Sequence, residues 1–141
     1  MTNLIVSLAL FLSALVAIPA LPCYAQTTAE ITRGNCKACA ESCTETINYC
    51  TTKGGALAQA SVTNNLKDCI TACKMTSEFL SRGSTLQAKA AILCIDACNA
   101  AAKSLDQFPT DNKMKVCANE VRKCAGNLNK VAHADGNSKA L

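Results

Sequence analysis

The sequence predicts an all-α protein, an antiparallel up-down four-helix bundle with a cysteine-lined core. Breaks between predicted helices are few and regularly spaced, and they leave four helix-length segments rich in Ala, Lys, Glu, Gln and Leu. Aromatic residues make up only 4% of the chain, so the core must be built from small and aliphatic side chains, which suits packed helices better than packed strands. Because the connections are short, neighbouring helices should run antiparallel.

The first 25 residues have the pattern of a secretory signal peptide. They contain no charged side chain, carry an apolar run over residues 4–20, and end on Cys23-Tyr24-Ala25, a small-x-small cleavage pattern. We therefore expect residues 1–25 to be removed and the mature chain to be exported to the periplasm. Two alternatives stay open: an anchor helix, although the run is shorter than the ~20 residues of a membrane span, and lipidation at Cys23.

The rest of the chain should form a single domain, the bundle over residues 26–133, followed by a disordered polar tail over residues 134–141. Its 14 Lys and Arg exceed its 10 Asp and Glu, which gives a small net charge of +4 with no basic run. It also has few aromatic side chains on which nucleic-acid bases could stack. Nucleic acid is therefore not an expected partner. After removal of the signal we also expect no membrane association.

The first predicted helix covers residues 28–53 and stops at the pair Gly54-Gly55. Its four cysteines fall within an arc of about 60° if each residue turns the helix by about 100°. Three of them are one heptad apart, as expected for a stripe facing the centre of a bundle. These cysteines are Cys36, Cys39, Cys43 and Cys50.

The second predicted helix covers residues 57–82 and ends at Gly83, while the third covers residues 84–107 and begins with the capping-box pattern Ser-Thr-Leu-Gln at 84–87. Each helix has two cysteines four residues apart, which places them one turn apart on a common face. The pairs are Cys69 with Cys73 and Cys94 with Cys98.

The fourth predicted helix covers residues 111–132, with Thr110 or Asp111 as its cap. Apolar residues and thiols alternate on one stripe of this helix, so the stripe should face the interior. Its members are Met114, Cys117, Val121, Cys124, Leu128 and Val131. Ten thiols are therefore directed at one core.

Free cysteine is often simply a small buried hydrophobe, but ten thiols on inward faces exceed what that explanation covers. The Cys36-Lys37-Ala38-Cys39 motif is not preceded by the strand of a thioredoxin-like site. Zinc sites want clustered pairs or Cys and His on turns, and the chain has a single His. Iron–sulfur clusters need cysteines converging from loops. No catalytic set of Ser, His and Asp or of paired carboxylates converges on the thiol face, so we expect no enzyme.

Two hypotheses remain for the thiols. In the first, disulfides Cys69–Cys98 and Cys73–Cys94 staple an antiparallel hairpin, an arrangement that resembles small helical-hairpin chaperone proteins of the cell envelope. The other six cysteines lie along the first and fourth predicted helices, and they would form an unusual set of disulfides.

In the second hypothesis the core is a soft-metal store. Cu(I) prefers thiolate ligands, accepts two or three of them, and tolerates thiolates shared between neighbouring ions. Two thiolates one helical turn apart, or one from each of two facing helices, suffice for such an ion.

Four motifs of the chain resemble those of the copper storage proteins, and the similarity spans residues 29–131. They are Cys36-x-x-Cys39-x-x-x-Cys43, the stretch 66–73 followed by 79–84, Cys94-x-x-x-Cys98, and the stretch 117–125. The resemblance implies a bundle that binds many Cu(I) ions through its ten mature cysteines, often assembled as a homo-tetramer. The chain departs from the family pattern at four positions where cysteines would be expected, so it should bind fewer copper ions than fully lined members. These positions are Ala101, Leu105, Val121 and Leu128.

Three further side chains bear on copper binding. Met114 lies on the inward stripe and could offer a thioether at the end of the bundle near Cys50. Met75 should face away from the core. His133, in the last turn before the tail, could meet entering copper, but a solvated surface histidine is the favoured interpretation.

Overall fold

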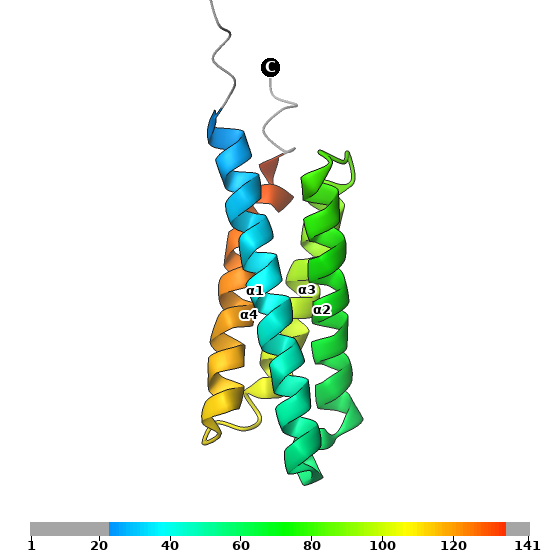
Figure 1. The fold of residues 1–141 in the computed structure, drawn as a ribbon, viewed down its shortest axis with the longest axis vertical. Helices are drawn as coiled ribbons and strands as arrows, with labels where there is room; N and C mark the ends of the chain where they lie inside the picture. The colour runs from blue at the N-terminus through cyan, green and yellow to red at the C-terminus, as the bar shows by residue number, and fades with distance from the viewer. Residues whose placement is uncertain (1–22, 135–141) are drawn as a thin grey trace, which may run out of the picture.

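The computed structural model describes residues 23–134, with side chains described from residue 28, and consists of four helices and one short 3-10 turn. The four helices form a bundle in which successive helices run in opposite directions (Figure 1). The elements in chain order are α1 (Cys23–Lys53), the 3-10 turn η1 (Gly55–Ala58), α2 (Ala60–Ser81), α3 (Gln87–Leu105) and α4 (Asn112–Ala132). The predicted all-α bundle is confirmed, and residues 23–134 contain no strand.

Side-chain contacts between the helices follow an antiparallel register. From Cys69 to Cys73 the residue number rises along α2, while the partners on α3 fall from Cys98 to Cys94. Each helix packs mainly against two others, in the pairs α1 with α2, α2 with α3, α3 with α4 and α1 with α4. The four helices therefore enclose a single core.

The predicted helix ends are partly confirmed. The Asp111 carboxylate accepts a hydrogen bond from the Met114 backbone N–H at 3.1 Å, so Asp111 is the N-cap of α4. Gly83 follows α2 with a φ of 59°. Its N–H bonds to the Leu80 carbonyl and the Ser84 N–H bonds to the Phe79 carbonyl, the two bonds of a Schellman motif.

The predicted capping box at residues 84–87 is wrong. Helix α3 begins at Gln87, and its N-cap residue Leu86 has no side-chain capping bond. Ser84 completes the end of α2, and its hydroxyl accepts a hydrogen bond from the Leu86 N–H in the connection itself. The prediction failed because the same serine fits both the end of one helix and the start of the next.

The second helix starts three residues later than predicted, because residues 55–58 form the turn η1. Gly54 and Gly55, with φ values of 71° and 60°, supply the left-handed backbone that starts this turn. Helix α1 in turn begins at Cys23, earlier than predicted. Residues 1–22 of the predicted signal peptide and residues 135–141 of the predicted tail lie outside the described residues, so both remain predictions.

The core is made of thiols and small or aliphatic side chains. The four positions at which the family resemblance would place further cysteines are buried apolar side chains: Ala101, Leu105, Val121 and Leu128. Every buried side-chain nitrogen or oxygen in the described part of the chain has a hydrogen-bond partner. Within residues 23–134, no helix combines the length and the apolar character of a membrane span.

Candidate metal centre

All ten cysteines of the predicted site are buried, each at most 1% exposed, which confirms the inward stripes on all four helices. They are Cys36, Cys39, Cys43, Cys50, Cys69, Cys73, Cys94, Cys98, Cys117 and Cys124. The helical periodicity explains this outcome, since residues three, four or seven apart share one face of a helix.

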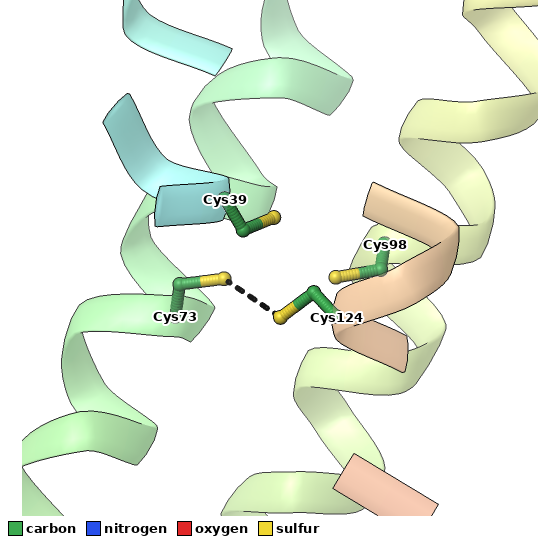
Figure 2. Close-up of side chains that lie close together, drawn as sticks. All are labelled: Cys39, Cys73, Cys98 and Cys124. Atoms are coloured by element: carbon green, nitrogen blue, oxygen red, sulfur yellow. Dashed lines mark hydrogen bonds between the residues drawn. The ribbon is translucent and has the colours of Figure 1, made fainter. Parts of the chain in front are cut away.

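Four thiols meet at the centre of the bundle, one from each helix. Cys39 of α1, Cys73 of α2, Cys98 of α3 and Cys124 of α4 have their Sγ atoms within 4.8 Å of one another. Figure 2 shows the four side chains pointing toward one another, with the Sγ atoms of Cys73 and Cys124 4.0 Å apart. We name these residues the central group.

A second group of thiols shares Cys73 with the central group. Cys36, Cys73 and Cys94 also have their Sγ atoms within 4.8 Å of one another. Cys73 and Cys94, on facing helices, are separated by 3.5 Å. A metal ion in this group would therefore use a thiol that also faces the central group.

A third group shares Cys39 with the central group. It consists of Cys39, Cys43 and Cys69, with 3.6 Å between the Sγ atoms of Cys39 and Cys69. Cys69 in turn lies 3.5 Å from Cys98. The three groups thus form one continuous set of thiols, connected through Cys39 and Cys73.

The structure does not bring the remaining two cysteines into these groups. Cys50 lies near the end of α1, where its Sγ atom is 3.8 Å from the Met114 sulfur. Cys117 lies beside Cys43. Hydrogen bonding between these two thiols lowers the pKa of Cys117 to about 7 and raises the pKa of Cys43.

Hydrogen bonds between thiols also shift pKa values in the central group. Hydrogen bonding with Cys124 is the main cause that lowers the pKa of Cys39 and raises the pKa of Cys73. Burial opposes ionisation of every one of these thiols, because a thiolate loses its hydration in the core.

Among residues 28–134, no positively charged side chain is buried inside the bundle to balance thiolates. The buried polar side chains of residues 28–134 are hydroxyls, those of Thr32, Thr46, Thr76 and Ser104. A set of thiolates there requires bound cations to replace the protons. The core is therefore neutral when protonated and is suited to exchange protons for metal ions.

The central group is a four-thiol set of the kind that zinc prefers. The described residues contain one such set. Two of its members are shared with the flanking groups, so the arrangement as a whole matches an ion that accepts two or three shared thiolates better than one that needs four of its own.

The disulfide hypothesis is not favoured. The predicted partners, Cys69 with Cys98 and Cys73 with Cys94, are indeed neighbours, but their Sγ atoms lie 3.5 Å apart. A disulfide bond is about 2.05 Å long. The ten cysteines of residues 28–134 are all free thiols.

Of the other candidate ligands, only Met114 lies near a thiol. Met75 is half-buried on the side of α2 that borders a groove with α3, as predicted for a residue off the inward stripe. His133 is exposed at the end of α4 and does not reach the thiol groups. The sequence did not predict the hydrogen bond from the Tyr49 hydroxyl to Asp111, 2.7 Å long, which joins the end of α1 to the start of α4.

Comparison with known proteins agrees with this geometry. The family model described as copper storage protein matches residues 25–133, which is most of the chain. No curated protein and no solved structure gives a significant match. The chain belongs to the copper storage protein family, and its clustered cysteines are placed to store copper.

Proposed function

We propose that the buried thiols hold several Cu(I) ions at once, as thiolate-bridged clusters, and that the protein sequesters copper without catalysing a reaction. The observation that carries this proposal is the sharing of Cys39 and Cys73 between thiol groups. A shared thiolate can bridge two ions, and Cu(I) is the biological metal ion whose low coordination number and soft character make such bridges favourable.

The charge of the core supports Cu(I) over divalent ions. Each Cu(I) that replaces one proton leaves the charge of the interior unchanged, and the described core has no other buried charge to offset an excess. If each ion takes two or three partly shared thiolates, the capacity is on the order of five to ten ions. Ala101, Leu105, Val121 and Leu128 keep the capacity below that of a bundle with cysteine at those positions.

A titration tests this proposal. Reduced protein is titrated anaerobically with Cu(I) against a coloured Cu(I) chelator, and the number of ions withheld from the chelator is counted. We expect several Cu(I) per chain, retained when an equal concentration of Zn(II) is present. Saturation at a single ion, or displacement of copper by zinc, would contradict storage of Cu(I).

Export to the periplasm is part of the proposal. It is supported by the signal-like composition of residues 1–25. Cell fractionation tests it: we expect the mature chain, starting near Gln26, in the periplasmic fraction. Full-length chain in the cytosol would contradict export.

We also propose that the protein is a homo-oligomer, with the tetramer implied by the family resemblance as the expected size. Ile92 and Leu93 support this, because they are adjacent, about half exposed at 49% and 54%, and lie on the outer side of α3. Light scattering on the purified protein tests the assembly. A Leu93→Lys variant should shift it toward monomer, and a wild-type mass equal to one chain would contradict it.

A further inference from the structure

At one end of the bundle, a thiol and a thioether lie in contact outside the three thiol groups. Cys50 is on the last turn of α1 and Met114 is on the first turn of α4, where these two helices meet. The Cys50 Sγ atom is 3.8 Å from the Met114 Sδ atom, and both side chains are fully buried. The two soft donor atoms are therefore as close as the paired thiols of the core.

The start of α4 is held in place by more than packing. Asp111 accepts hydrogen bonds from the Met114 N–H at 3.1 Å and from the Tyr49 hydroxyl at 2.7 Å. Tyr49 immediately precedes Cys50. Through these two bonds Asp111 joins the start of α4 to the Tyr49 side chain near the end of α1, the region in which the two sulfur atoms lie.

The charge around this pair differs from that around the thiol groups. Asp111 places a carboxylate beside it, and burial together with this charge raises the pKa of Cys50. A Cu(I) ion bound by two thiolates carries a net negative charge, which the carboxylate would repel. A Cu(I) ion bound by one thiolate and one thioether is neutral. The local field therefore favours a thioether as the second ligand.

In the metal-free protein the Met114 sulfur accepts a hydrogen bond from the buried Cys50 thiol, which a leucine could not do. The other stripe positions of α4 that carry no thiol are Val121, Leu128 and Val131, and a leucine of similar volume would fill the position of Met114. What methionine adds is a polarisable sulfur that binds soft metal ions without having to lose a proton.

We propose that Cys50 and Met114 form a separate Cu(I) site, with one thiolate and one thioether ligand, at the α1–α4 end of the store. This proposal rests on the proposed function, since it assumes that the thiol core takes up Cu(I). Loading of this site releases one proton per ion, and the uncharged thioether makes it a weaker site than the thiolate-bridged groups. It is therefore the last to fill and the first to release its ion to a chelator.

Selenium X-ray absorption tests this site directly. The full chain is produced with selenomethionine as a Met75→Leu variant, which keeps selenium at Met114, and as a Met114→Leu variant, which keeps it at Met75; Met1 is common to both. After loading with Cu(I), we expect a selenium–copper scattering path in the Met75→Leu protein and none in the Met114→Leu protein. Absence of that path in the Met75→Leu protein would overturn the proposal.

Copper capacity gives the second measurement. Met114→Leu and Cys50→Ala should each withhold one Cu(I) fewer than wild type from a competing chelator, and the double variant should also lose only one. Met75→Leu should lose none. Equal capacity of wild type and Met114→Leu overturns the mixed site while leaving storage intact. Failure of wild type itself to bind several ions contradicts both proposals. Circular dichroism confirms that each variant keeps its helices.

Discussion

The Sγ atom of Cys73 lies 3.5 Å from that of Cys94 on the facing helix, while it also lies 4.0 Å from that of Cys124 on the helix across the bundle. One thiol therefore belongs to two groups of potential ligands. This relationship connects the geometry of the core with storage of several ions, because a shared thiolate bridges ions that would otherwise be separate.

Removal of a shared thiol should cost more copper than removal of a peripheral one. We expect Cys73→Ser to lose about two Cu(I), because two groups lose a ligand, whereas Cys50→Ser loses about one. Chelator competition on the two reduced variants measures the difference. Equal losses from both variants would show that the thiols act as independent ligands.

Reductant should not change the stability of the metal-free protein. The ten thiols are free, so thermal unfolding with and without a reducing agent should give the same midpoint, and thiol titration of the native chain should count all ten. If two disulfides stapled α2 to α3, reduction would lower the free energy of unfolding by about 2–5 kcal/mol. A clear shift of the midpoint would revive the hairpin hypothesis.

The Asp111 cap should make a measurable contribution to stability. Asp111→Ala removes the acceptor for the Met114 N–H and for the Tyr49 hydroxyl, and we expect a loss of about 1–2 kcal/mol in the free energy of unfolding. Asp111→Asn is the matched control, because asparagine also caps helices and should retain most of the stability. Urea unfolding compares the three proteins; equal losses in both variants would argue against capping.

The same residue predicts part of the response to acid. The hydrogen bond from Tyr49, followed by the backbone N–H bonds of α4, holds the pKa of Asp111 below its ordinary value. A group with a lowered pKa in the folded state stabilises the fold above its unfolded pKa, and the contribution disappears as the pH falls through the folded pKa. Tyr49→Phe should therefore lose less stability than wild type between pH 5 and pH 2, as measured by urea unfolding. An unchanged acid response would contradict this role.

Two glycines should respond in opposite ways to replacement by alanine. Gly83 has a φ of 59°, in the left-handed region, so Gly83→Ala should lower the free energy of unfolding by about 1 kcal/mol. Gly126 lies inside α4, and a Cβ atom added there would meet no other atom within 4 Å, so Gly126→Ala should raise it by up to about 1 kcal/mol. Thermal or urea unfolding of both variants checks the opposite signs; destabilisation by Gly126→Ala would contradict this account of α4.

The sequence predicted the bundle and the inward thiols because both depend on local periodicity. The heptad spacing of Cys36, Cys43 and Cys50 places them on one face whatever the neighbouring helices do. The sequence also predicted correctly that Cys69 lies beside Cys98 and Cys73 beside Cys94. A short connection between antiparallel helices limits the offset of α2 and α3 along the bundle axis.

What the sequence could not predict depends on contacts between helices that are distant in the chain. Whether Cys73 meets Cys94 alone or also Cys124 is decided by the axial position of α4, which is set by packing across the whole core and by the Tyr49–Asp111 bond. The start of α3 was misplaced for a related reason: Ser84 has the residue type of a cap, but its N–H is already bonded to the carbonyl of Phe79.

The most direct test of the central claim is a crystal structure of the copper-loaded protein, with data collected on both sides of the copper absorption edge. The account predicts several anomalous peaks inside the bundle, with Cys39 and Cys73 each contacting more than one copper ion. A single peak, or peaks confined to the surface of the bundle, would contradict storage by shared thiolates.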